Sequence, residues 1–106
     1  MKNNYSQSFA VSKKGHDAKT VYVVLAEDDR YVYLADGKHR RVSSPKKKKK
    51  KHIICVFANK LSEYISEETP ITDGRLRRAI REFTVENTET VEKIRNGIEA
   101  HSREEE

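Results

Sequence analysis

The chain lacks several features that would direct it to particular classes of protein. Among its 106 residues there is no tryptophan and a single cysteine, so no disulfide can form within the chain, and a lone thiol is typical of a reducing compartment such as the cytoplasm. No run of about 18 apolar residues is present, which argues against a transmembrane helix. Residues 1–10 are polar and do not form the apolar stretch of a secretory signal. We therefore expect a cytoplasmic protein.

Charge, in contrast, is abundant and unevenly distributed. Charged residues make up 37% of the chain and hydrophobic residues only 35%, so the core must be small. Residues 1–52 hold 14 Lys and Arg against 5 Asp and Glu, a net charge of +9, whereas residues 53–106 hold 8 against 12, a net charge of −4. This asymmetry indicates that the first half carries a surface for a polyanion.

The first half has the apolar and β-branched pattern of short strands. We expect five of them, at residues 8–12, 20–26, 31–35, 38–42 and 52–58. The dipeptide Asp36-Gly37 indicates a tight type I′ hairpin, because that turn needs positive φ at both central residues. Five short strands joined mostly by tight turns predict a small closed or half-open barrel, which hides strand edges.

The second half changes to the apolar period of helices. A first helical segment ends at Pro70, and a second begins where Thr72 or Asp73 can cap it. A third covers about residues 87–100, and we expect the acidic tail at 101–106 to be disordered. The second segment has an apolar stripe at helical spacing, made of Leu76, Ala79, Ile80 and Phe83.

Six consecutive lysines, Lys46–Lys51, follow Pro45 and lie between two predicted strands. We expect them to form a loop or the start of the last strand. Each phosphate that a lysine neutralises releases a condensed counterion, so the run is typical of a nucleic-acid contact. A solvated loop, a nuclear localisation signal and an anionic-lipid contact are the alternatives. A membrane anchor would also need an amphipathic basic helix with large apolar residues, which we do not find.

Two further basic clusters accompany the lysine run, one around Gly15 and one just before Pro45. Their members are Lys13, Lys14, Gly15, His16, Lys19, Lys38, His39, Arg40 and Arg41. Because the loops at one end of a small barrel converge, we expect the three clusters to form one positive surface. Tyr5, Tyr31 and Tyr33 either stack on bases there or pack against their neighbours.

Candidate catalytic and metal-binding residues are scattered. His52 and Cys55 are three positions apart, which places them on opposite faces of a strand, and no second pair completes a zinc site. Asp28 and Asp29 are explained by turn chemistry. The chain has no glycine-rich phosphate loop, nucleophile elbow or paired carboxylates. We expect neither catalysis nor a metal or other cofactor.

Several stretches resemble the KOW-motif RNA-binding proteins of bacteria, which are relatives of a KOW-containing ribosomal protein of the archaeal and eukaryotic large subunit. They are Val-Ser-Lys-Lys-Gly-His-Asp at 11–17, Val-Tyr-Val-Val at 21–24, and 31–42, which contains Ala-Asp-Gly-Lys. The Pro-Lys-Lys-Lys element at 45–48 follows, and 70–80 resembles the C-terminal extension of these proteins. One position departs from the pattern, since the KOW loop normally has glycine where this chain has Lys19.

This resemblance implies a mostly β fold, an SH3-like five-stranded barrel at 1–58 with a helical extension at 59–106. It also implies binding to structured RNA in a ribosomal setting, and we expect a monomer. Phosphates would be neutralised by the basic clusters and by Lys46, Lys47, Lys48, Lys49, Lys50 and Lys51, while Gly15 lets the backbone approach. The alternative is a protein-interaction module, because SH3-like barrels also bind peptides and the arginine-rich helix near residue 78 suits an acidic partner.

Overall fold

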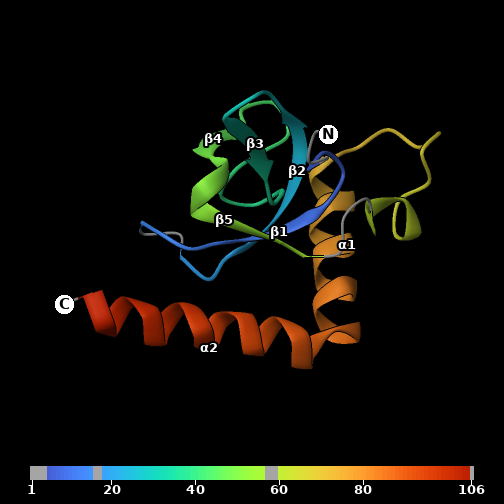
Figure 1. The fold of residues 1–106 in the computed structure, drawn as a ribbon. Helices are drawn as coiled ribbons and strands as arrows, with labels where there is room; N and C mark the ends of the chain where they lie inside the picture. Colours follow the sequence, from blue (N-terminus) through green and yellow to red (C-terminus); the bar gives the residue numbers. More distant parts are fainter. Residues whose placement is uncertain (1–4, 16–17, 57–59, 106) are drawn as a thin grey trace.

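The computed structural model describes residues 5–15, 18–56 and 60–105 of the chain, and it contains one five-stranded antiparallel sheet with two long helices (Figure 1). The sheet has the order β4-β3-β2-β1-β5. Its strands are β1 (Phe9–Ser12), β2 (Val21–Glu27), β3 (Tyr31–Ala35), β4 (Lys46–Lys49) and β5 (Ile53–Val56). A 3₁₀ helix, η1 (Lys50–His52), joins β4 to β5, which returns to pair with β1. No pairing joins β4 to β5 among the described strands, so the sheet is not closed.

Both faces of the sheet carry a hydrophobic cluster. β1 is paired on both sides and all four of its residues are buried. Along β2 the side chains alternate, so that Val21 and Val23 join the larger cluster and Tyr22 and Val24 join the smaller one. The smaller cluster also contains Val32 of β3 and Ile53 of β5, and the larger one is covered by the helices. The predicted five-stranded, mostly β architecture is therefore confirmed.

The helices pack on the larger cluster and share its core with the sheet. They are η2 (Lys60–Glu63, a 3₁₀ helix), α1 (Asp73–Glu86) and α2 (Thr88–Glu105). Phe83 of α1 stacks on Phe9 of β1 with ring centroids 3.9 Å apart, and Tyr64 meets both rings edge-on. Such aromatic contacts add to the burial of apolar area in holding α1 on the sheet. In Figure 1, α2 turns away from α1 and runs past the sheet.

The fourth strand is not where the sequence predicts it. Residues 38–42 lie in the loop 36–45, and the lysine run itself forms β4. The Asp36 carboxylate accepts hydrogen bonds from the backbone N–H groups of Lys38 and Arg40, which holds this part of the loop in a turn. Only Gly37 has positive φ in this turn, at 78°, so the predicted type I′ hairpin is wrong.

Contacts with α1 explain why the loop 36–45 is not a strand. The Val42 N–H donates to the carboxylate of Asp73 at 2.8 Å, and the Arg77 guanidinium donates to the Gly37 carbonyl. A Cβ on Gly37 would lie 2.2 Å from the Asp73 carbonyl oxygen. The loop is thus fastened to the first turn of α1, a long-range contact that a local sequence pattern does not report.

Two of the predicted helical segments differ in extent from expectation. After Pro70 the helix begins as predicted, with the Thr72 hydroxyl capping it by accepting from the Arg75 N–H at 3.2 Å. The segment before Pro70 forms only the short η2, and α2 continues to Glu105, into the predicted disordered tail. Residues 57–58 of the last predicted strand lie outside the described residues. None of the described helices combines the length and apolar character that a membrane crossing needs.

Candidate nucleic-acid interface

The lysine run is divided by the pleat of β4. Lys46, Lys47, Lys48 and Lys49 pair with Leu34, Tyr33, Val32 and Tyr31 of β3 in turn. Successive side chains of a strand point to opposite faces. Lys47 and Lys49 are therefore exposed on the outer face, whereas Lys48 lies on the face of Val32 and is only 9% exposed. Six chemically identical residues thus have different roles.

Lys48 is a structural residue. Its Nζ donates to the Ser12 hydroxyl at 2.7 Å and to the Lys14 carbonyl oxygen at 2.6 Å. These bonds connect the edge strand β4 to the end of β1, three strands further along the sheet, and so draw the sheet into a curl. The ammonium is buried with its partners, and the expectation that Lys48 contacts a phosphate does not fit this geometry.

The outer lysines contact tyrosines. The Nζ of Lys47 lies 4.3 Å from the centre of the Tyr31 ring, and that of Lys50 lies 5.0 Å from the Tyr5 ring. Tyr33 donates its hydroxyl to the Asp28 carboxylate at 3.0 Å. The three tyrosines therefore have partners within the chain, which favours packing over base stacking for them. A cation held over a ring stays accessible to solvent, so Lys47 remains available to an anion.

Lys50 is neutralised by Glu27. The two form an ion pair of 2.9 Å, and the same carboxylate accepts hydrogen bonds from the N–H groups of Tyr5 and Ser6. Burial alone would raise the pKa of Glu27, but the bonds from Lys50, Ser6 and Tyr5 outweigh it and lower that pKa below 4.5. This cluster fixes the segment before β1 against η1. It leaves less net charge at Lys50 than at its neighbours.

A concentrated positive region surrounds His52 at the end of η1. Partial burial lowers the pKa of His52 below 6.5, and repulsion from Lys14, Lys51, Lys49 and Lys48 lowers it further. The backbone N–H of Lys13 donates to the His52 carbonyl at 2.8 Å, which brings the loop after β1 against η1. Two of the three predicted basic clusters, around Gly15 and in the lysine run, are thereby brought together.

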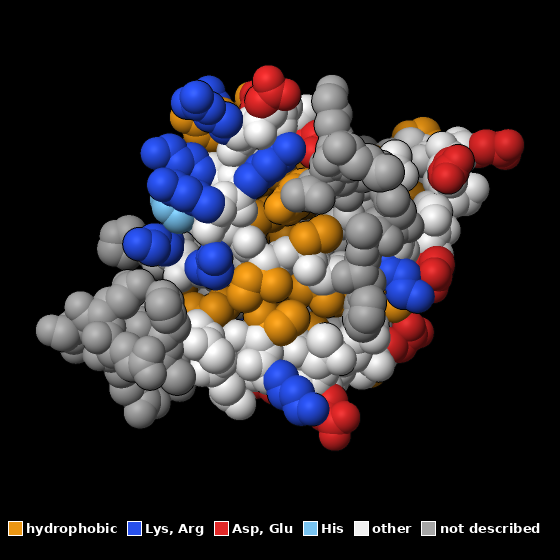
Figure 2. Space-filling model, in the orientation of Figure 1, with side chains coloured by type: hydrophobic (Ala, Val, Ile, Leu, Met, Phe, Trp, Pro, Cys, Tyr) orange, Lys and Arg blue, Asp and Glu red, His pale blue; other side chains and the backbone are white. Residues whose placement is uncertain are grey.

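We call this surface the basic edge. It comprises Lys13, Lys14, Arg30, Lys47, Lys49 and Lys51. Figure 2 shows Lys and Arg side chains gathered along the side of the molecule formed by β4 and η1. Arg30, which the sequence analysis did not select, lies in the turn before Tyr31, and its carbonyl accepts from the Lys50 N–H at 2.8 Å. In the sequence, the only sign that Arg30 belongs to this surface is its position between two predicted strands, next to Tyr31.

The remaining basic candidates, from the cluster before Pro45 and from Lys19, lie elsewhere on the surface. Lys19 and Lys38 line a hollow of about 590 Å³ beside α1, together with Arg77 and Arg81. Arg40, Arg41 and His39 are exposed in the loop 36–45, and Nδ1 of His39 lies 3.7 Å from the Asp36 carboxylate. The structure thus places the candidate residues in two groups rather than on the single surface that we expected. His16 lies outside the described residues.

Lys19 has an unusual backbone conformation for a residue with a side chain. Its φ is 74°, in the left-handed region that glycine adopts most easily. Gly15, in the same loop, has a φ of 90°. The Lys19 N–H donates to the Ser12 carbonyl at 2.8 Å, which closes the loop between β1 and β2. Lys19 therefore places a cation in a loop that stays closed.

Within the described residues, no group of three or more His, Cys, Asp or Glu side chains is placed to hold a metal ion. Cys55 is a free, half-buried thiol on β5. No protein-family model and no curated protein matches this chain, so the role of the basic edge has to be inferred from its own chemistry.

Proposed function

We propose that this protein binds structured RNA through the basic edge and that it belongs with the KOW-motif proteins. The main support is the gathering of lysines from two separate segments around His52: the Lys13 N–H donates to the His52 carbonyl at 2.8 Å, and the neighbouring lysine charges lower the pKa of His52. Like charges gathered around one residue repel one another, and of these lysines only Lys48 is used by the fold itself. A polyanion relieves that repulsion and releases its own counterions.

The strand order supports the finer assignment of the fold. A meander of four strands, a 3₁₀ helix and a fifth strand that returns to β1 is the connectivity that an SH3-like barrel requires. The Lys48 bonds from β4 to Ser12 and Lys14 bring the two ends of the curled sheet toward each other. We therefore propose a half-open SH3-like barrel with a helical extension that shares its core.

The mechanism is phosphate neutralisation by a rigid row of cations. Lys47 and Lys49 are two positions apart on one face of a strand, which spaces them by roughly 7 Å, close to the separation of successive phosphates. Lys51 and Lys13 continue the row from η1 and the loop after β1. Contacts of this kind recognise the shape of an RNA backbone and read little sequence. Ribosomal RNA in the cytoplasm is the target that the KOW resemblance suggests.

The test compares two triple variants at several salt concentrations. Lys47→Ser, Lys49→Ser and Lys51→Ser together remove the row but keep Lys48 and therefore the strand. We expect affinity for a structured ribosomal RNA fragment to fall and the slope of log K against log salt to decrease by about 2 to 3. The matched control is Lys60→Ser, Arg78→Ser and Arg81→Ser, which removes the same charge elsewhere. Equal losses in both variants, or no loss in the first, would overturn the proposal.

The alternative of a protein-interaction module has less support. Three arginines of α1 are engaged within the chain: Arg75 donates to the Pro70 carbonyl, Arg77 to the Gly37 carbonyl, and Arg78 to Glu82. A partner that stays bound after nuclease treatment and is lost with an Arg81→Ser variant would favour this alternative instead.

A further inference from the structure

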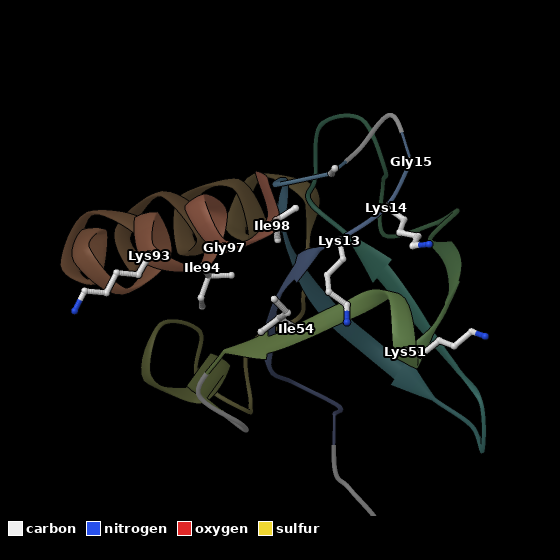
Figure 3. A pocket seen from close by; sticks show the side chains of 10 residues that line it. Lys13, Lys14, Gly15, Lys51, Ile54, Lys93, Ile94, Gly97 and Ile98 are labelled. Atoms are coloured by element: carbon white, nitrogen blue, oxygen red, sulfur yellow. The ribbon is translucent and has the colours of Figure 1, made fainter. Parts of the chain in front are cut away.

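A groove of about 620 Å³ lies where the loop after β1, the strand β5 and the helix α2 meet (Figure 3). Ile54 of β5 and Ile94 and Ile98 of α2 supply its apolar surface. Lys13, Lys14 and Lys51 project along the other side. In Figure 2, hydrophobic side chains are visible at this level between the sheet and α2. The groove therefore has apolar walls, a cationic rim of three lysines, and one further lysine, Lys93, on the α2 side.

The cationic rim is part of the basic edge. Lys51 lies in η1, two positions after Lys49, and Lys13 and Lys14 lie beside η1. An RNA backbone that runs along Lys47 and Lys49 consequently reaches the groove with its phosphates still neutralised by lysines. At the groove, the surface next to these lysines becomes apolar and concave.

The wall formed by α2 is unusually open at Gly97. This residue is exposed, and a Cβ built there would meet no atom within 4 Å. A flat group can therefore approach the helix backbone beside Ile94. A glycine inside a helix costs about 0.5–1 kcal/mol relative to alanine, and the fold gains no packing from it here. The open position is consistent with space kept for a ligand.

We propose that this groove receives an unpaired nucleotide of the bound RNA, with its base against Ile54 and Ile94 and its phosphates on Lys13, Lys14 and Lys51. The inference rests on the proposed function and adds a preference for RNA with unpaired bases. A base has a flat apolar face that fits the isoleucines, and its own backbone supplies the anions for the rim. Among the described lining residues, the isoleucines offer a base no hydrogen-bonding group and Lys93 is the one charged side chain beside them on α2, so the groove accepts a base without selecting its identity.

An acidic amphipathic peptide is the other class of ligand that combines an apolar surface with negative charge. The row of cations favours RNA, since lysines at regular spacing along β4 lead into the rim, as repeated phosphates require. A short peptide would use the groove alone and would leave Lys47 and Lys49 without a role.

The test uses Gly97→Leu, which fills the groove from a position with room for the side chain. The matched control, Asn96→Leu, adds the same side chain one position earlier, at an exposed site that does not line the groove. Affinities are measured at one salt concentration for two RNA hairpins, one fully paired and one with a single bulged nucleotide. Circular dichroism checks that both variants keep their helices.

We expect the wild type and Asn96→Leu to bind the bulged hairpin about tenfold more tightly, the effect of one base contact, and Gly97→Leu to lose this preference while still binding the paired hairpin. No preference in the wild type, or an unchanged preference in Gly97→Leu, would overturn the inference and leave the basic edge intact. If neither hairpin binds, the proposed function itself fails. If Gly97→Leu blocks a Glu- and Leu-rich peptide but alters neither RNA affinity, the groove belongs to a protein partner.

Discussion

The Nε of Arg95 on α2 donates a hydrogen bond of 3.0 Å to the carbonyl oxygen of Lys19, 76 residues earlier in the chain. This bond connects the loop between β1 and β2 to the helix that forms one wall of the groove. Its acceptor belongs to the residue with the left-handed φ of 74°. The geometry of that loop and the position of α2 are therefore coupled.

Replacing Arg95 by methionine should loosen α2. Methionine keeps an unbranched apolar stem but cannot donate, so the Lys19 carbonyl loses its partner. We expect the free energy of unfolding to fall by about 1–2 kcal/mol, measured by urea denaturation. Arg78→Met is the control, because its exposed pair with Glu82 contributes less than about 0.5 kcal/mol. Equal losses in the two variants would show that the bond to Lys19 does not hold the helix.

Gly37→Ala and Gly97→Ala should have opposite effects on stability. An added Cβ at Gly37 lies 2.2 Å from the Asp73 carbonyl oxygen, and the φ of 78° is itself unfavourable for alanine. We expect a loss of at least about 2 kcal/mol there. At Gly97 the Cβ meets nothing, and alanine should add about 0.5–1 kcal/mol by favouring the helix. Thermal unfolding of both variants tests this, and a stable Gly37→Ala protein would contradict the contact between the loop 36–45 and α1.

Lys48→Ser and Lys49→Ser should separate stability from binding. Loss of the buried Lys48 removes two hydrogen bonds from a charged group and should cost about 2 kcal/mol of stability. Loss of the exposed Lys49 should change stability by less than about 0.5 kcal/mol. It should reduce the salt slope of RNA binding by about 0.7–0.9. Denaturation and binding isotherms on both proteins give the comparison, and identical behaviour would refute the division of roles along β4.

The elements with strong local patterns could be predicted from the sequence. The strands at Phe9, Val21 and Tyr31 have alternating or continuous apolar residues, and α1 has both a cap at Thr72 and an apolar stripe that ends at Phe83. Residues 38–42 were misassigned because the Asp36 and Asp73 carboxylates that hold them act through tertiary contacts. The lysine run gave no strand signal, since like charges in succession have low strand propensity. It is a strand because β3 offers a free edge to pair with.

The candidate site could be predicted only in part. The lysines of the run and of the Gly15 loop do lie together around His52, as their expected convergence at one end of the sheet requires. Lys19 and Lys38 were assigned to the same surface but line a groove with Arg77 instead. Charge alone does not reveal which lysine is buried, because that depends on the pairing register of β4. The apolar groove was missed because Ile54 and Ile94 are far apart in sequence and each has an ordinary role in its own element.

The pH dependence of RNA binding should depend on His52. In the free protein the pKa of His52 lies below 6.5, because of partial burial and the charges of four lysines. Bound phosphates offset those charges and raise the pKa of His52, so the bound protein holds its proton to higher pH. Affinity should therefore increase as pH falls from 6.5 through the lowered pKa. NMR titration of the imidazole in the free and bound protein measures the shift.

His52→Gln is the control for this titration. It should bind with an affinity that varies less over the same pH interval. The same repulsion acts on the free fold: because protonation is disfavoured there, the wild type should lose stability relative to His52→Gln as pH falls below 6.5. If RNA leaves the pKa of His52 unchanged, this residue is not part of the RNA interface.

A strand made of one residue type also tolerates a shift in its pairing register. In most strands, sliding the chain by one position exposes the apolar side chains and buries the polar ones. In β4 such a slip replaces each lysine by another lysine, so the buried donor to Ser12 and the outward row are both recreated. The run is also held beyond β4, where the Lys50 N–H donates to the Arg30 carbonyl, and any lysine can make this bond because it uses the backbone. Deleting or adding one lysine therefore changes the length of the run but leaves a lysine at each position of the β4 ladder.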